Sequence, residues 1–407
     1  MKRIIALMLS LVIGAALFAG CGKKAADPER EAAPVIGIEG MTLRSFEEKL
    51  LSYLDVSEKG NYVVSPLSFK FSLALLIAGA RGDTQRELLD AFAAGSEDEF
   101  ANSLYEFYEF AKTVDPSFDK AKDVSDIAKK QTALRLANSV WSAKSSTGFD
   151  IEYFEKARKL GAEVLVFDSV SDVNGWVSDK TGGMIPQLIP NDFSAEEIES
   201  TLINAMYFKS LWMHEFDKDK TEQDVFTAAS GEKKQKDYMS DKLTVPYYSD
   251  DDTQLVILPF RANFKDVEMV FVIGSTENIR SKIAKAAENT VNVRIPKFKV
   301  ETKLDNNELI AFLKSCGVEK VFSKEADLSG MFTGGIHRVG KAVQNSVFSI
   351  DEEGAEGASA TAQVIYSGIP PEDKGVTFVA DRPFAFFVTA QRESGTLEVL
   401  FEGRIVE

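Results

Sequence analysis

Histidine is scarce in this chain, and this scarcity limits the catalytic sites that the sequence can hold. Only His214 and His337 occur among 407 residues. His214 lies in a run with Trp212 and Phe216, so we expect it to be a structural side chain. The metalloprotease pattern H-E-x-x-H and the hydrolase pattern G-x-S-x-G are both absent. The sequence therefore predicts no enzyme activity, no metal ion and no cofactor.

One stretch superficially fits a phosphate-binding loop but lacks a residue that such a loop needs. Gly335–Lys341 has the glycine spacing of the loop and ends in lysine. The next residue is Ala342, where the loop requires a serine or threonine to bind Mg²⁺. The stretch also leads into a strand-like segment instead of a helix. We interpret the match as chance.

Cysteine is equally scarce, which restricts disulfide bonding. The two cysteines are Cys21 and Cys316. If Cys21 carries a lipid, no disulfide can form within the mature chain, and a chain of this length can do without one. Cys316 lies between apolar stretches, so we expect its thiol to be buried and unreactive.

The chain has no excess of positive charge. Its formal net charge is −16. The first twenty residues contain two basic residues and no acidic one, which leaves 45 basic and 63 acidic residues and a net charge of −18 in the remainder. Nucleic acids and anionic lipid surfaces would be repelled. We therefore expect no nucleic-acid partner.

Long apolar runs are absent except at the N-terminus. Two basic residues precede an apolar run from Ile4 to Phe18, and small residues follow before Cys21. This order is typical of a secretory signal, and the run is too short for a comfortable transmembrane helix. Leu17–Cys21 resembles the bacterial lipoprotein box, in which the cysteine is acylated and becomes the new N-terminus.

The lipoprotein resemblance implies a division of the N-terminal region. Residues 1–20 would be a signal peptide, and residues 21–40 would be the lipidated Cys21 followed by a tether, because this stretch is mostly Gly, Ala, Lys, Glu and Pro. We expect the protein to lie at the cell surface, held to a bacterial membrane by the lipid on Cys21. The alternative is a plain signal peptide with an incidental cysteine.

The rest of the chain, residues 41–407, has no second linker and no internal repeat, so we expect one domain. Apolar residues from Leu43 onward have helical spacing, and a second helix is predicted through Phe69 to Ala78. Strands are predicted at 254–259, 267–273, 291–295, 347–350 and 396–401. Helices and strands are mixed without alternating βαβ units, which favours an α+β fold with mostly antiparallel sheet.

A stretch of small residues follows the strand predicted at 347–350. Nearly every residue from Gly354 to Ala362 is small, and the stretch ends in residues that favour strands. If it became a strand, four small residues at alternate positions would share one face, which could lie against a packed core: Ala355, Gly357, Ser359 and Thr361. The alternative is a flexible surface loop.

The segment Glu352–Ala360 resembles the hinge of a serpin reactive-centre loop, and further blocks of this family follow the family's order. They span nearly all of residues 43–405: Asn61–Ser68 (N-x-x-x-S-P-x-S), Gly79–Thr84, Leu136–Trp141, Asn174–Val177 with Thr181 and Ile185, Ile203–Lys209 with Trp212 and Phe216, Pro296–Phe298, Ala326–Met331, Asp381–Phe384 and Leu400–Arg404. So many blocks in one order are not accidental. The domain at 41–407 is identified as a member of the serpin family of serine protease inhibitors.

The resemblance implies both a fold and a mechanism. The fold would have three β-sheets surrounded by about nine helices, with an exposed reactive-centre loop. A serine protease would attack this loop, become acylated, and be trapped when the cleaved loop inserts as a strand in the main sheet. Loop insertion in serpins is an established example of strand addition. The expected partner is therefore a serine protease in a covalent acyl complex, and we expect the inhibitor to be a monomer.

The resemblance also assigns roles to individual residues. The hinge would comprise Glu352, Glu353, Gly354, Ala355, Gly357, Ala358, Ser359 and Ala360. The shutter, a polar cluster beneath the strands that must open, would comprise Asn61, Ser65, Ser68 and Asn204, with Gln344 where many members have histidine. Trp212 would lie at the breach, where insertion begins; an ordinary core tryptophan is the alternative.

The bond that the protease cuts stays open within a short segment. Counting seventeen residues from Glu352 gives Gly368–Ile369, whereas Tyr366–Ser367 suits a chymotrypsin-like pocket and Ser367–Gly368 an elastase-like one. No Arg or Lys lies between residues 353 and 371, which disfavours trypsin-like targets. The alternative function is a non-inhibitory serpin that acts as a surface binding protein.

Overall fold

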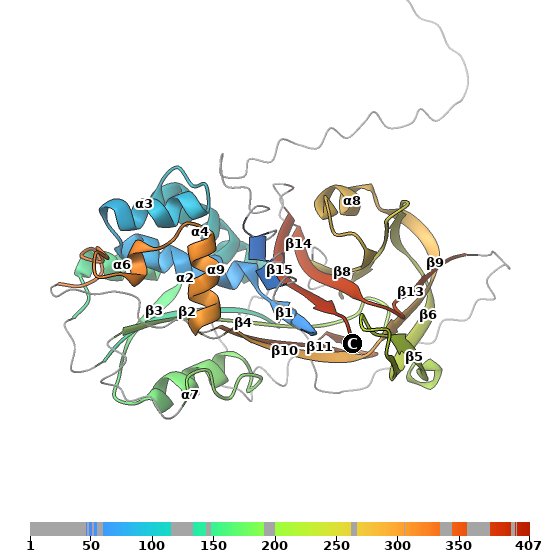
Figure 1. The fold of residues 1–407 in the computed structure, drawn as a ribbon. Helices are drawn as coiled ribbons and strands as arrows, with labels where there is room; N and C mark the ends of the chain where they lie inside the picture. Colours follow the sequence, from blue (N-terminus) through green and yellow to red (C-terminus); the bar gives the residue numbers. More distant parts are fainter. Residues whose placement is uncertain are drawn as a thin grey trace, which may run out of the picture. The chain divides into compact units, whose positions relative to one another are not determined.

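We describe a computed structural model of the chain (Figure 1). It describes residues 60–114, 133–143, 148–190, 200–261, 267–304, 306–333, 344–355, 375–391, 395 and 397–407, together with five positions of an N-terminal helix at 46, 49, 50, 53 and 54. All of these residues belong to one compact unit, Ile36–Glu407. Cys21, the predicted signal peptide and the predicted tether lie outside the described residues.

Seven α-helices have complete bounds among the described residues: α2 (Pro66–Gly79), α3 (Gly82–Ala91), α4 (Glu97–Val114), α6 (Ile151–Lys159), α7 (Val170–Lys180), α8 (Ile279–Lys285) and α9 (Asn306–Ser315). Helix α2 contains the predicted helix at Phe69–Ala78. The helix begins after Ser65, because the Ser65 side chain accepts the N–H of Ser68 at 3.2 Å and Pro66 occupies the first turn. None of the described helices has the length and apolarity to cross a bilayer.

The strands among the described residues form two hydrogen-bonded sheets. They are β1 (Tyr62–Val64), β2 (Ala133–Ala143), β3 (Ala162–Phe167), β4 (Ser200–Leu211), β5 (Glu222–Thr227), β6 (Lys233–Ser249), β7 (Thr253–Pro259), β8 (Val267–Gly274), β9 (Ala287–Pro296), β10 (Phe298–Leu304), β11 (Gln344–Ile350), β12 (Gly354–Ala355), β13 (Val376–Val379), β14 (Phe384–Gln391) and β15 (Leu397–Ile405). The smaller sheet has the order β10-β11-β12-β4-β2-β3. The larger has the order β1-β15-β14-β8-β7-β6-β9-β13, with β5 also paired to β6.

The predicted α+β class is confirmed, and so are the strands predicted from apolar runs. Pairing is antiparallel except between β2 and β3 and between β9 and β13. Two hydrogen-bonded sheets appear where three are expected, because the 17-residue strand β6 joins two sets of strands. Residues 233–238 of β6 pair with β5, residues 238–247 pair with β9, and Tyr247–Ser249 pair with β7.

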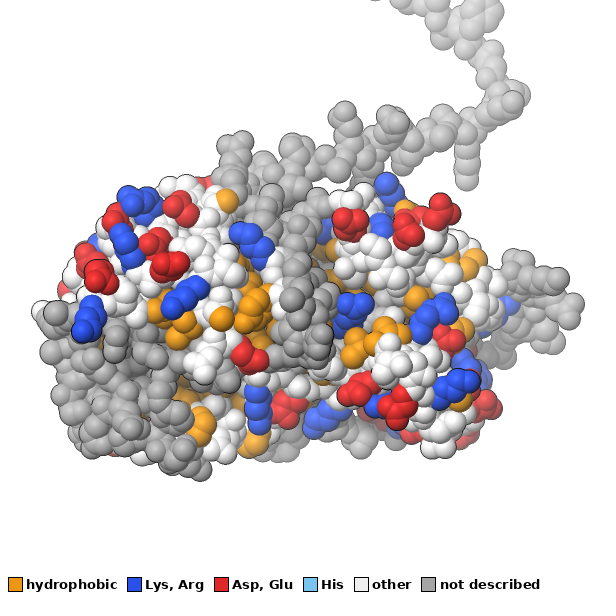
Figure 2. Space-filling model, viewed as in Figure 1, with side chains coloured by type: hydrophobic (Ala, Val, Ile, Leu, Met, Phe, Trp, Pro, Cys, Tyr) orange, Lys and Arg blue, Asp and Glu red, His pale blue; other side chains and the backbone are white. Residues whose placement is uncertain are grey.

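Aromatic residues pack the two sheets against each other. Phe348 of β11 stacks on Phe386 of β14, with ring centroids 5.4 Å apart, and Phe298 lies 5.0 Å from the same ring. All three belong to one buried hydrophobic core. Figure 2 shows acidic and basic side chains interspersed on the visible face, in agreement with acids spread along the chain. Through this core the smaller sheet packs against the larger one, and its central strands include β12, the predicted hinge.

Candidate functional site

The predicted hinge already forms a short strand within the smaller sheet. Gly354 and Ala355 make up β12, which lies between β11 and β4. Ala355 pairs with Ile350 of β11 on one side and with Ser210 of β4 on the other. The side chain of Ala355 is buried in the main core. The start of the loop is thus held between two strands that would have to separate further for a longer insertion.

A tight turn at Asp351 reverses the chain between β11 and β12. The Asp351 carboxylate accepts the N–H of Glu353 at 2.9 Å and that of Gly354 at 3.2 Å. The Asp351 N–H donates in turn to the Gly354 carbonyl at 2.9 Å. Position 354, at the end of the turn, has to be glycine, because a Cβ there would overlap the Ser210 carbonyl oxygen and lie 2.8 Å from Leu211 Cα.

Trp212 lies beside this turn and binds it through two hydrogen bonds. Its indole N–H donates to the Asp351 carbonyl at 2.9 Å, and its backbone N–H donates to the Glu353 carbonyl at 2.9 Å. The ring is 1% exposed and stacks on Phe260, with centroids 4.9 Å apart. Trp212 is therefore a core tryptophan that also contacts the predicted hinge.

The Glu352 carboxylate is buried and held by two donors. Thr221 Oγ1 donates to it at 2.8 Å, and Lys297 Nζ lies 3.1 Å away. Burial acts to raise the pKa of Glu352, but the hydrogen bonds from Thr221 and Lys297 outweigh it, so the pKa lies below its ordinary value. The backbone carbonyl of Glu352 accepts the N–H of Phe216 at 2.9 Å. The carboxylate is therefore charged at neutral pH and fixes the hinge.

The Glu353 carboxylate is bound by a different cation. Lys218 Nζ forms an ion pair with Glu353 Oε1, and this hydrogen bond is the main cause that raises the pKa of Lys218. Lys218 opens the short 3₁₀ helix η2 (Lys218–Lys220), which Asp217 caps by accepting the N–H of Asp219 at 3.0 Å. The side chain of Glu353 is 11% exposed, whereas that of Lys218 is 55% exposed.

Three of the predicted shutter residues lie in one polar cluster. Ser68 Oγ donates to Asn204 Oδ1, and Asn204 Nδ2 donates to Asn138 Oδ1. Asn138 Nδ2 then donates to the carbonyl of Leu160 at 3.3 Å. Ser65 joins through the N–H of Ser68. Because Asn204 lies opposite Asn138 in the register of β4 and β2, this chain of hydrogen bonds ties both strands to helix α2.

Two predicted shutter residues lie outside this network. Asn61 binds the C-terminal end of the chain: its Oδ1 accepts the N–H of Val406 at 2.8 Å, and its Nδ2 donates to the Glu407 carbonyl at 3.2 Å. Gln344 begins β11 opposite Leu304. Its Oε1 is buried and has no hydrogen-bond partner among the residues that the structure describes.

Eight of the sequence-predicted positions lie outside the described residues. They are the later hinge residues Gly357, Ala358, Ser359 and Ala360 and the candidate cut-site residues Tyr366, Ser367, Gly368 and Ile369. Cys316 is half-buried rather than fully buried, and this burial raises the pKa of its thiol. Within the described ranges, no cluster of three or more His, Cys, Asp or Glu is placed to hold a metal ion.

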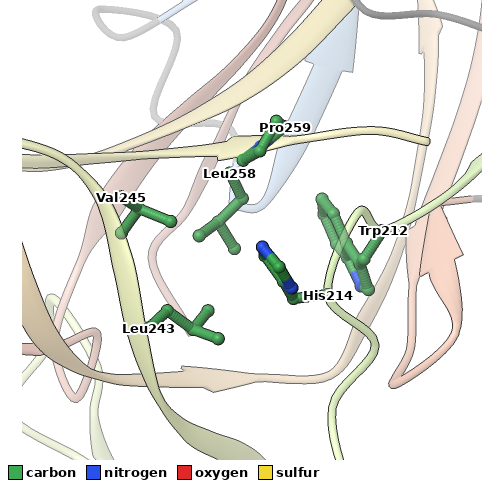
Figure 3. Close-up of a pocket in the computed structure, with 6 residues that line it drawn as sticks. All are labelled: Trp212, His214, Leu243, Val245, Leu258 and Pro259. Atoms are coloured by element: carbon green, nitrogen blue, oxygen red, sulfur yellow. The ribbon is translucent and has the colours of Figure 1, made fainter. Parts of the chain in front are cut away.

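A shallow hollow adjoins Trp212 but contains no catalytic arrangement. His214 lies in it beside Trp212, facing apolar side chains from β6 and β7 (Figure 3). The lining residues are Trp212, His214, Leu243, Val245, Leu258 and Pro259. Since His214 is the one titratable side chain in this set, the hollow offers no nucleophile and no acid–base pair.

Sequence reasoning missed four residues that contact the predicted sites. Asn138 and Lys297 lie in blocks that carried the family resemblance, so the blocks already pointed to them. Lys218 and Thr221 lie in a polar stretch without any distinctive pattern. Each meets the hinge across more than 130 positions of sequence, and no local spacing reports such a contact.

Comparisons with known proteins agree with this geometry. The family model described as Serpin (serine protease inhibitor) matches residues 41–407. "Serine protease inhibitor" of Cyanea capillata is 29% identical and covers 85% of this chain and 92% of its own length. Leukocyte elastase inhibitor of Bos taurus is 28% identical, and the alignment covers 87% of this chain and 95% of that protein. The crystal structure of Serpin48 from the insect Tenebrio molitor aligns with a TM-score of 0.71 at 26% identity, over 90% of this chain and 96% of that one.

Proposed function

The chain belongs to the serpin family of serine protease inhibitors, and we propose that it inhibits serine proteases by inserting its cleaved loop into the smaller sheet. The observation that supports this most directly is β12, because the start of the loop already pairs with β11 and β4. The small residues Gly354 and Ala355 also argue against a non-inhibitory surface protein, in which bulky or charged hinge residues would block entry.

The chemistry of the trap belongs to the protease. The hydroxyl oxygen of its active-site serine attacks a carbonyl carbon of the loop, the peptide bond breaks, and the new amine leaves with a proton. The loop residue stays on the protease as an ester. Water would normally hydrolyse this ester. Insertion of the loop carries the protease along and distorts its active site, so hydrolysis stalls.

The sheet can supply the driving force for this movement. Inserting some ten residues makes on the order of ten ladder hydrogen bonds, and at ~1 kcal/mol net each they contribute roughly 10 kcal/mol. This is comparable to the stability of a whole domain. The uncut protein is therefore metastable and is held by a kinetic barrier. The hydrogen bonds that join Ser68, Asn204 and Asn138 would contribute to this barrier, because they tie β4 to its neighbours.

We propose chymotrypsin- or elastase-like proteases as targets. The absence of Arg and Lys between residues 353 and 371 removes the anchor that a trypsin-like pocket needs. Tyr366, Ser367 and Gly368 are the candidate residues on the N-terminal side of the cut. Faster trapping of trypsin than of chymotrypsin or elastase would contradict this proposal.

We further propose that the inhibitor is a monomer held to a bacterial cell surface by a lipid on Cys21. The support is the lipoprotein-like sequence ending at Cys21. The test is membrane fractionation of the native host, followed by mass spectrometry of the N-terminal peptide. An unmodified cysteine, or a soluble cytoplasmic protein, would contradict the anchor without affecting the inhibitory proposal.

The inhibitory proposal is tested by trapping. The chain from residue 22 onward is mixed with chymotrypsin, pancreatic elastase and trypsin, boiled in SDS, separated on a gel, and the released C-terminal fragment is weighed. A boiling-stable band at the summed mass shows an acyl complex, and the mass of the fragment identifies the cut bond. Clean cleavage without such a band would show that the loop is only a substrate for these proteases.

A pair of variants separates insertion from cleavage. Ala355→Arg places a charged side chain where the structure has a buried alanine, so we expect normal cleavage and no complex. Glu356→Arg changes the next residue, whose side chain would point to solvent by strand alternation, and it should still trap the protease. Equal trapping by both variants would refute insertion at this position.

A further inference from the structure

One short segment makes five of the described contacts with the hinge. Residues 212–221 supply the two hydrogen bonds of Trp212, the backbone N–H of Phe216 to Glu352, the Thr221 hydroxyl to Glu352 and the ion pair of Lys218 with Glu353. Of these contacts, the ion pair is the one whose two members differ most in exposure.

Because of this difference in exposure, loss of the partner would cost Glu353 more free energy than it would cost Lys218. Lys218 is 55% exposed, so its ammonium group would be well hydrated without a partner. Glu353 is 11% exposed, and its neighbours Asp351 and Glu352 are also acidic. A carboxylate left alone in such a place is strongly unfavourable, because a buried charge requires a partner. The hinge can avoid this cost by leaving the sheet and exposing Glu353 to water.

We propose that Lys218 is a positioning residue that keeps the hinge strand β12 paired in the sheet before a protease arrives. This inference rests on the proposed inhibitory function and concerns its resting state. Lys218 neutralises Glu353 at the base of the loop, so that Gly354 and Ala355 stay between β11 and β4. Without Lys218, the equilibrium shifts toward a loop whose hinge lies outside the sheet.

The position of Lys218 allows a closely matched control. Lys220 lies on the same 3₁₀ helix and is also 55% exposed, but it pairs with Asp241 at 3.3 Å, not with the hinge. Lys220→Ala therefore removes an equally exposed cation from the same turn. Any general effect of charge loss or local unfolding would appear in both variants.

The test is hydrogen exchange of the full chain without any protease, followed by mass spectrometry of the peptides that contain residues 351–356 and 206–211. Lys218→Ala should speed exchange in both peptides about tenfold, as expected when a buried carboxylate loses its partner. Lys218→Arg, which keeps the charge, should exchange like the wild type, and so should Lys220→Ala.

A second change separates a positioning role from general structure. Glu353→Gln removes the buried charge, so the double variant Lys218→Ala/Glu353→Gln should return exchange to the wild-type rate. If Lys218→Ala leaves exchange unchanged, or if Glu353→Gln fails to restore it, the proposal is wrong. Because exchange is measured on the uncut protein, this outcome is independent of whether the chain traps a protease.

Discussion

Replacing Gly354 by alanine tests whether insertion begins at β12. The added Cβ would overlap the Ser210 carbonyl oxygen and lie 2.8 Å from Leu211 Cα. Both are backbone atoms of β4, which is also paired with β2 over ten residues, so β4 cannot move aside cheaply. We therefore expect Gly354→Ala to displace the hinge from the sheet.

The size of the effect follows from the hydrogen bonds that are lost. Displacing two residues removes about two ladder hydrogen bonds, or about 2 kcal/mol at ~1 kcal/mol each. Once displaced, the hinge must re-enter the sheet before the rest of the loop can insert, so the same steric conflict opposes every later step of insertion. A barrier higher by about 2 kcal/mol slows insertion roughly thirtyfold. Hydrolysis of the acyl-enzyme then competes more effectively, and more protease escapes.

The assay is titration of a fixed amount of chymotrypsin or elastase, with the moles of inhibitor consumed per mole of complex as the readout. For each mole of complex formed, Gly354→Ala should release roughly thirtyfold more inhibitor that is cleaved without trapping the protease. Gly175→Ala in α7 is the matched control, because an added Cβ there meets no heavy atom within 4 Å. Wild-type stoichiometry for Gly354→Ala would refute the argument that β12 is the entry point.

Three further predictions concern the surroundings of the hinge. Trp212→Phe removes the indole N–H to Asp351, so hinge exchange should rise about fivefold for ~1 kcal/mol; unchanged exchange would contradict this. Asn138→Ala leaves the amide of Asn204 without its acceptor, so the free energy of unfolding in urea should fall by about 1–3 kcal/mol, and no fall would refute a structural role for this cluster. Because the pKa of Glu352 lies below its ordinary 4.5, its stabilising effect is complete above pH 4.5 and is lost as the pH falls through the lowered value. The melting temperature of Glu352→Gln should therefore fall less between pH 5 and pH 3 than that of the wild type, and identical curves would argue against it.

Local patterns in the sequence were sufficient for helix α2 and for the five strands predicted from apolar runs. The apolar runs that became β7, β8 and β11 are short and rich in residues that favour strands, and such signals need no tertiary information. The small residues from Gly354 onward indicated a segment able to enter a sheet. Their pairing at rest could not be predicted, because it depends on how far apart β11 and β4 stand.

The shutter shows the limit of motif transfer. Ser68 and Asn204 are hydrogen-bonded to each other, but the third member of their hydrogen-bonded chain is Asn138, which the motif did not name as a shutter residue. Asn61 instead binds the backbone at Val406 and Glu407. A motif fixes residue types at a given spacing, whereas the partner of each side chain depends on the register of the strands around it.

The sequence by itself therefore determined the class of the fold and the family, and it predicted the hinge segment. It did so because helix and strand signals, glycine and small-residue requirements and family blocks are all local in the chain. The tertiary structure alone decided that β6 joins two sets of strands, that β12 is already paired, and that Lys218 and Thr221 bind the hinge. Those contacts join residues 135 and 131 positions apart, and their energies depend on burial, which only the folded chain creates.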